Sequence, residues 1–234
     1  MRGIEPLGED ALLLRVGDIV DAPANARVHA LAAALDAARP GWVRDLVPAY
    51  ATLAVFVDVR AMGDVAEPLA IAEAWIKSVR GSGDGGEGLP PGASAALATA
   101  APAPAPTTVV PVRFGGEDGP DLPSIATAAG LSEEDTVSRF CAPTFRVAML
   151  GFAPGFPYLL GLDPALAMSR LDVPRTRVPA GSVGIGGAQA GIYPREGPGG
   201  WRLLGRTPLG LFDPTRDPPA LLAPGHHVRF VPAT

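Results

Sequence analysis

The sequence predicts an α+β protein in which a small α/β domain is followed by a β-barrel. Residues 1–80 alternate buried-strand and amphipathic-helix patterns in the order β-α-β-β-α. Residues 109–234 carry short β-forming runs between glycine- and proline-rich turns, which is typical of a small barrel with shaped loops. Residues 81–108 between them are mainly glycine, alanine, serine and proline, and they predict a linker.

Three strands and two amphipathic helices account for the first domain. An apolar run between two glycines predicts a buried strand, and a run rich in β-branched and aromatic residues predicts another. Both helical patterns place apolar residues on one stripe, and the first stops before Pro40 and Gly41. In order, we expect a strand at 10–16, a helix at 24–38, strands at 43–47 and 52–59, and a helix at 65–79.

The second domain combines the barrel with a small helical insertion. Its first strand contains Pro111, which favours an edge position. A short helix closed by Gly130 follows, and Ser132 precedes a second helix with acidic residues in its first turn. We expect strands at 109–114, 145–150, 182–186, 190–193, 201–204 and 227–231, a helix at 121–129, and a second helix from 132 to near 141–143.

Composition and charge argue against several classes of function. The net charge is −5 and the isoelectric point is near 5.2, which argues against nucleic acid or an acidic lipid surface as a partner. Cys141 is the single cysteine, so no internal disulfide can form and a reducing compartment is expected. No signal-peptide pattern and no apolar run of about 18 residues is present. We therefore expect a soluble, cytoplasmic protein.

Motifs for the common catalytic chemistries are absent or weak. The single lysine, Lys77, lies in a helical pattern without the glycines of a phosphate-binding loop. Three histidines and one cysteine offer no metal-ligand spacing, so no metal site is expected. Residues 180–184 (AGSVG) come close to the nucleophile elbow of serine hydrolases, but a strand rather than a helix follows. For Ser182, a ligand contact or a turn-stabilising role is favoured over a nucleophile.

The stretch 150–207 combines most of the special glycines and prolines with polar side chains suited to a ligand. Arginines flank its loops, and a guanidinium matches a carboxylate or phosphate with two hydrogen bonds. A tyrosine between turns can line a pocket and donate a hydrogen bond. Two alternatives to ligand binding stay open. The arginines can form a solvated rim of the barrel, and the tyrosines can pack in its core. The candidates are Tyr158, Arg175, Arg177, Ser182, Gln189, Tyr193, Arg195, Arg206 and Thr207, and Trp201 is expected in the barrel core.

Five strings of residues, in their order and spacing, resemble the family of 5-oxoprolinase B subunits. They are GFAPGFPYLLGLDP, VPAGSVGIGG, GIYP, PGGWRLLGRTP and LFDP. The segments PLGEDALLLRVGD, PAYATLAVFVD and PVRFGGEDGPDL also fit, so the resemblance covers nearly the whole chain. The family is also known as allophanate hydrolase subunit 1, and it includes an inhibitor of a sporulation histidine kinase.

The resemblance implies a small α/β domain followed by a cyclophilin-like β-barrel, related to the carboxyltransferase region of urea carboxylase. It also implies a subunit of an ATP-dependent amidohydrolase complex, in the first place 5-oxoprolinase, which opens the lactam of 5-oxoproline to give glutamate. The expected partners are a C-type subunit, which has a second cyclophilin-like barrel, and a third 5-oxoprolinase subunit. ATP and its Mg²⁺ are expected to be bound by or shared with these partners, and the chain alone is expected to be inactive.

A set of site residues follows from the resemblance together with the chemistry. An unstrained amide resists hydrolysis unless its carbonyl oxygen is activated, so the site needs cations for phosphate and donors for a developing oxyanion. The catalytic candidates are Arg206, Thr207 and Arg175. The candidates for binding the lactam or amide substrate are Tyr158, Ser182, Gln189, Tyr193, Gly155 and Phe156.

One segment departs from the family pattern. Members usually carry histidine and tyrosine before the GF-x-PGF motif, where this chain has Phe140 and Phe145. Another substrate, such as a different lactam, an amide, allophanate or a urea-derived compound, is therefore an open alternative. A further alternative is a regulatory protein that inhibits a histidine kinase through an exposed barrel face and needs no substrate cleft.

Overall fold

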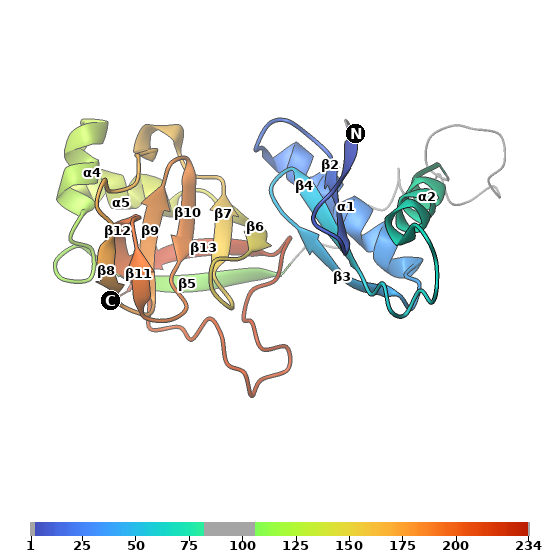
Figure 1. Ribbon diagram of the computed structural model, residues 1–234. Coiled ribbons are helices and arrows are strands. Elements are labelled where there is room, and N and C mark those ends of the chain that lie inside the picture. The colour runs from blue at the N-terminus through green and yellow to red at the C-terminus, as the bar shows by residue number, and fades with distance from the viewer. Residues whose placement is uncertain (1–2, 82–105, 234) are drawn as a thin grey trace. The chain divides into compact units, whose positions relative to one another are not determined.

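The computed structural model describes residues 3–81 and 106–233, and the chain forms two compact units, 1–104 and 105–234 (Figure 1). Most of the predicted linker 81–108, namely residues 82–105, lies outside the described residues. The described part of each unit has a hydrophobic core of its own. The α+β fold class is confirmed.

In its described residues, the N-terminal unit is a four-stranded antiparallel sheet with two helices. Its strand order is β1-β2-β4-β3. All predicted elements are present, but β1 was not predicted, because its largely exposed residues show no apolar pattern. The elements are β1 (Gly3–Pro6), β2 (Ala11–Arg15), α1 (Ala22–Ala37), β3 (Val43–Pro48), β4 (Thr52–Val57) and α2 (Pro68–Gly81).

Apolar stripes on both helices contribute to the core of this unit. Val28 of α1 and Ile76 of α2 are fully buried. Trp42 and Trp75 meet edge to face, with ring centroids 5.4 Å apart. The second helix begins at Pro68 rather than at residue 65, because proline suits the first helical turn and disfavours helix in the residue before it.

The C-terminal unit is built around a closed barrel. Around it, the strand order is β10-β7-β6-β13-β5-β12-β9, and β9 pairs with β10 to close the circle. Among the described strands of the barrel, β5 and β13 pair in parallel and the other neighbours are antiparallel. The strands are β5 (Thr107–Phe114), β6 (Phe145–Leu150), β7 (Pro157–Leu160), β9 (Ser182–Gly186), β10 (Gln189–Ile192), β12 (Arg202–Arg206) and β13 (His227–Pro232).

Every strand predicted in this unit lies in the barrel, but three short strands were missed. The first is β7, which carries Tyr158, a residue expected between glycine- and proline-rich turns but not in a strand. The others are β8 (Arg175–Val178) and β11 (Gly197–Gly199), which form a separate two-stranded sheet. Strand β5 starts at Thr107, inside the predicted linker, because it pairs with β13 from that residue on.

The helical insertion consists of α4 (Leu122–Ala129) and α5 (Glu133–Cys141), as predicted. Helix α4 packs against β12, and α5 packs against β13. Phe140 of α5 contacts Phe145 and Phe230, with ring centroids 5.3 and 4.9 Å away. Both Phe140 and Phe145 are fully buried in the barrel core. The two residues that depart from the family pattern are therefore packing residues.

Candidate functional site

The described residues of the barrel unit form several pockets, and two of them are neighbours: Tyr193 lines one and Pro194 lines the other. We call the larger, of about 360 Å³, the arginine pocket, and the smaller, of about 80 Å³, the aromatic pocket. The arginine pocket is lined by Arg113, Ala180, Gly181, Pro194, Arg206, Thr207, Pro208, Leu209 and Gly210. The aromatic pocket is lined by Phe152, Phe156, Tyr158, Arg170, Tyr193, Gly199, Gly200 and Trp201.

Gly181 shapes the arginine pocket through its backbone. Its φ of +82° lies in the left-handed region that favours glycine. Its N–H donates to the carbonyl oxygen of Tyr193 at 2.7 Å, and its own carbonyl oxygen accepts from the N–H of Thr207 at 2.9 Å. A Cβ at this position would collide with the Thr207 carbonyl oxygen. The glycine of the VPAGS string therefore connects the segments that line both pockets.

Two guanidinium groups share one carboxylate in the arginine pocket. Arg113 Nε lies 2.8 Å from Oδ2 of Asp118, and Arg206 Nη1 lies 3.8 Å from Oδ1. The hydrogen bond to Asp118 raises the pKa of Arg113, which stays charged. Arg206 Nε also donates to the carbonyl oxygen of Ala180 at 2.8 Å. Two cations against one anion leave a net positive charge, so the pocket can receive a carboxylate or a phosphoryl oxygen.

Interlocked rings form the walls of the aromatic pocket. Phe156 meets Tyr193 and Trp201 edge to face, with centroids 5.2 and 5.5 Å away. The ring centroids of Tyr158 and Trp201 lie 5.8 Å apart. Phe152 also lines the pocket, is 65% exposed and has a φ of +65°, an uncommon value for a residue with a side chain. The pocket thus combines buried rings with one exposed ring.

Glycines of the sequence strings make room for these rings. A Cβ on Gly191 would lie 2.8 Å from the ring of Trp201 and 2.9 Å from the ring of Phe156. A Cβ on Gly199 would overlap the ring of Tyr193. Because only glycine lets backbone approach a ring this closely, the GIYP and PGGW strings specify the aromatic pocket as well as the course of the chain.

The two tyrosines of the aromatic pocket are hydrogen-bond donors at neutral pH. Burial raises the pKa of Tyr158 and Tyr193, and the positive charge of Arg170 offsets part of the rise. For Tyr193, a hydrogen bond from the backbone of Trp201 also offsets it. Since the ordinary tyrosine pKa is about 10, both hydroxyl groups stay protonated.

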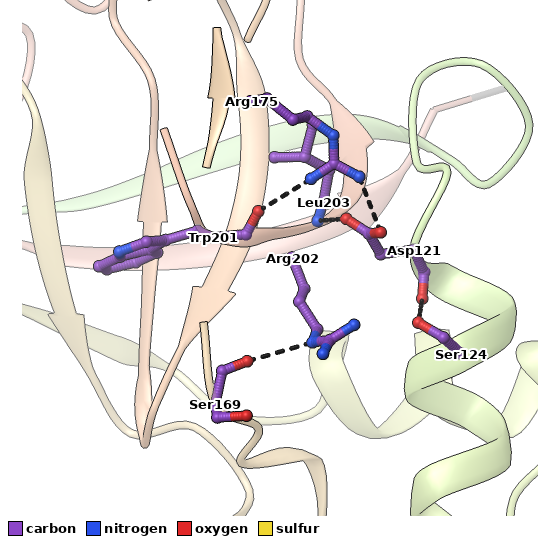
Figure 2. A network of polar contacts seen from close by, with 7 residues as sticks. All are labelled: Asp121, Ser124, Ser169, Arg175, Trp201, Arg202 and Leu203. Carbon is purple, nitrogen blue, oxygen red and sulfur yellow. Dashed lines mark hydrogen bonds and ion pairs between the residues drawn. The ribbon is translucent and has the colours of Figure 1, made fainter. Parts of the chain in front are cut away.

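A polar network holds the backbone at Trp201 and just after it (Figure 2). Arg175 Nη2 lies 2.8 Å from Oδ1 of Asp121, and its Nη1 donates to the Trp201 carbonyl oxygen at 3.4 Å. The other Asp121 oxygen accepts from the N–H of Leu203 at 2.6 Å. Asp121 precedes α4 but caps no N–H of that helix, because these partners occupy its carboxylate. Arg175 thus lies outside both pockets, in a network that positions Trp201.

The remaining predicted site residues lie in separate places. Ser182 is buried in β9 opposite Arg206, and the strand continues after it without the helix that a nucleophile elbow requires. Gln189 lies beside the other end of β9. Gly155 has a φ of +78°, and its backbone lies against Phe212. None of these three lines either pocket, and neither does Arg195 or Arg177, which pairs with Glu196.

The structure therefore brings five of the predicted residues together in two sets. Arg206 and Thr207 line the arginine pocket, and Phe156, Tyr158 and Tyr193 line the aromatic pocket. Trp201, which was expected in the core, is buried and also forms a wall of the aromatic pocket. Roles in binding or catalysis stay predictions for every residue of these sets.

Sequence reasoning missed five residues that form or support the pockets. Arg113 and Asp118 stand in PVRFGGEDGPDL and Phe152 in GFAPGF, so the family strings contained the signal for them. Asp121 was interpreted only as the start of a helix. Arg170 stands outside regular structure, and no pattern in the sequence distinguishes it from a solvated arginine.

Residues 3–81 and 106–233 hold neither a metal-binding cluster nor a membrane-spanning helix. No group of three histidine, cysteine, aspartate or glutamate side chains there is arranged to hold a metal ion. No helix in the same ranges is long and apolar enough to cross a membrane.

Comparison with known proteins gives consistent matches. The family model described as carboxyltransferase domain, subdomain C and D, matches residues 1–222. The chain is 39% identical over 231 residues to the 5-oxoprolinase B subunit of Bacillus subtilis, covering 97% of this chain and 91% of that protein. It is 54% identical over 123 residues to the 5-oxoprolinase B subunit of Escherichia coli O157:H7, covering 53% of this chain and 56% of that protein.

Among solved structures, the chain resembles the protein TTHA0988, with a TM-score of 0.76 and 37% identity. The match covers 97% of this chain but only 40% of TTHA0988, so this chain corresponds to one part of a longer protein. The solved relative thus contains a counterpart of each of the two units.

Proposed function

Because the chain belongs to the carboxyltransferase-domain family, subdomain C and D, and within it to the 5-oxoprolinase B subunits, we propose that it is a subunit of an ATP-dependent 5-oxoprolinase. The complex would open the lactam of 5-oxoproline with ATP and water, giving glutamate, ADP and phosphate. The observation that carries the proposal is the arginine pocket, with its net positive charge, in a chain that matches such a protein along nearly its whole length.

Arg206 and Thr207 are the proposed catalytic residues. The Arg206 side chain is 40% exposed, and its Nη1 is held only loosely by Asp118, so it can turn toward a ligand in the pocket. The Thr207 hydroxyl oxygen accepts from the N–H of Leu209 at 3.3 Å, which leaves its O–H to donate. Donors placed where negative charge develops on an oxygen lower the barrier to amide opening.

ATP supplies the phosphoryl group that activates the lactam carbonyl. The arginine pocket suits one anionic group better than a triphosphate, because Asp118 neutralises one of the two guanidinium groups. We propose that two partners, a C-type subunit with a related barrel and a third subunit, hold most of the nucleotide and its Mg²⁺. Arg113 and Arg206 would then contact the group on which charge develops. An ATP-dependent complex and a single cysteine, Cys141, also favour the cytoplasm.

The test is subunit omission. We expect glutamate release from 5-oxoproline and ATP when this chain is combined with its partner subunits, and none from this chain alone or from the partners without it. A well-assembled complex that releases no glutamate would contradict the proposal and favour another amide or a urea-derived substrate. A chain that assembles with no partner would contradict it as well and favour the regulatory alternative.

A further inference from the structure

Arg170 in the aromatic pocket is a cation without an acidic partner among the described residues. The arginines of the arginine pocket, Arg113 and Arg206, each pair with an aspartate, as does Arg175 behind Trp201. Arg170 instead stands over the ring of Trp201, with its guanidinium carbon 5.7 Å from the centroid. A guanidinium on an aromatic face keeps its N–H groups available for an anion.

The backbone on both sides of Arg170 is fixed. The carbonyl oxygen of Ser169 accepts from Arg202 Nε at 3.1 Å, an interaction that Figure 2 shows. The N–H of Leu171 donates to the carbonyl oxygen of Gly200 at 2.7 Å. Because both neighbours are tied to the segment that carries Trp201, Arg170 is held beside the pocket before any ligand arrives. Such preorganisation lowers the entropy cost of binding.

The dimensions of the aromatic pocket define the class of ligand. Its volume of about 80 Å³ corresponds to roughly five to eight water-sized groups. Its walls are aromatic rings that favour a flat apolar group, and the hydroxyl groups of Tyr158 and Tyr193 can donate to a carbonyl oxygen. A flat five-membered ring with one carbonyl oxygen is of this size, and a carboxylate on it would extend toward the pocket opening.

We propose that the aromatic pocket binds the ring of a small, flat cyclic carboxylate and that Arg170 pairs with the carboxylate. This inference rests on the proposed function and deepens it, because 5-oxoproline is a five-membered lactam that carries a carboxylate. The backbone hydrogen bond from Gly181 to Tyr193 joins this pocket to the arginine pocket, so ring recognition and charge stabilisation lie in adjacent places. Arg170 is then a specificity-determining residue.

The test follows the indole N–H signal of Trp201 in NMR spectra of the full chain. The chain has three tryptophans, and Trp201→Phe identifies the signal by its loss, while Trp42 and Trp75 of the N-terminal unit serve as internal references. The probes are 5-oxoproline and 2-pyrrolidone, which has the same lactam ring without the carboxylate. Arg177→Ala is the matched control, because Arg177 is 76% exposed, pairs with Glu196 and lines neither pocket.

We expect 5-oxoproline to shift the Trp201 signal in the wild type and in Arg177→Ala at the same concentration. In Arg170→Ala, the 5-oxoproline concentration that is needed to shift the Trp201 signal should rise roughly tenfold to hundredfold, as expected for the loss of a charge-assisted hydrogen bond. Binding of 2-pyrrolidone should be weaker and equal in all three proteins. A Trp201 signal that 5-oxoproline does not shift, or 5-oxoproline binding by Arg170→Ala that equals binding by the wild type, overturns the inference.

The outcome separates this inference from the proposed function. If the complex releases glutamate but 5-oxoproline does not shift the Trp201 signal, the proposed function is supported and the inference is overturned. An Arg170-dependent shift in a chain whose assembled complex opens no lactam supports the inference and overturns the function.

Discussion

The two pockets of the barrel unit differ in how complete they are. The aromatic pocket is small, and its rings and Arg170 are held in place by residues of this chain alone. The arginine pocket is larger, and its two guanidinium groups are partly occupied by Asp118. We infer that the first selects a ligand without help, whereas the second needs a partner protein or a nucleotide to complete it.

Different interactions maintain the two pockets, and each set of interactions can be removed by a separate substitution. The arginine pocket depends on the backbone of Gly181, whose positive φ lets three chain segments meet. The aromatic pocket depends on ring packing and on the Asp121–Arg175 pair behind Trp201. Substitutions at these positions therefore test whether the pockets are independent.

The largest expected effect comes from Gly181→Val. Strain from positive φ and the collision with the Thr207 carbonyl oxygen together should cost about 3–5 kcal/mol of unfolding free energy. Gly187→Val is the control, because Gly187 also has positive φ, +66°, but open space around it, so it should lose only about 1–2 kcal/mol. Equal losses in urea denaturation would show that the close contact at Gly181 is unimportant.

Next in size is Asp121→Ala, which leaves Arg175 and the N–H of Leu203 without their shared partner. We expect a loss of about 2–4 kcal/mol, since the pair is mostly buried. Glu196→Ala removes an exposed ion pair with Arg177 and should cost less than about 1 kcal/mol. The KM for 5-oxoproline should rise in Asp121→Ala alone, because Trp201 loses its support, and an unchanged KM would count against that role.

A similar loss of stability without a kinetic effect is expected for Phe140→His. The imidazole would enter a core of phenylalanine rings without a partner, at a cost of about 2–4 kcal/mol. Because Phe140 lines neither pocket, the folded complex should keep its kcat and KM. A changed substrate preference without a loss of stability would instead indicate that the segment around Phe140 belongs to the functional site.

Local patterns in the sequence predicted most of the fold and only part of the site. Apolar runs and cap residues located the helices of both units and most barrel strands, because burial and backbone preference act within a few residues. Strand β1 was not predicted because it is largely exposed, and β7 was not predicted because it is short and lies among turn residues. Glycine-rich strings located the pockets because several of these glycines leave room for a ring or a carbonyl oxygen that is close in space, although most of these partners are distant in sequence.

Partnerships between distant residues could not be predicted. The pair of Arg175 with Asp121 was not predicted, because the two residues are far apart in the sequence and Asp121 was interpreted only as a helix start. Arg170 was missed for the opposite reason, because its significance lies in having no acidic partner among the described residues. Charge pairing across a barrel depends on register, which single-sequence patterns do not encode.

We propose that the two pockets do different work, and a comparison of kcat and KM for Arg206→Ala and Arg170→Ala in the assembled complex tests this division. Arg206→Ala should lower kcat roughly a hundredfold with little change in KM, since it removes a donor to developing charge. Arg170→Ala should raise KM roughly tenfold or more with little change in kcat, and Arg177→Ala should change neither. Full kcat in Arg206→Ala, or the same pattern in both pocket variants, would contradict the division of work.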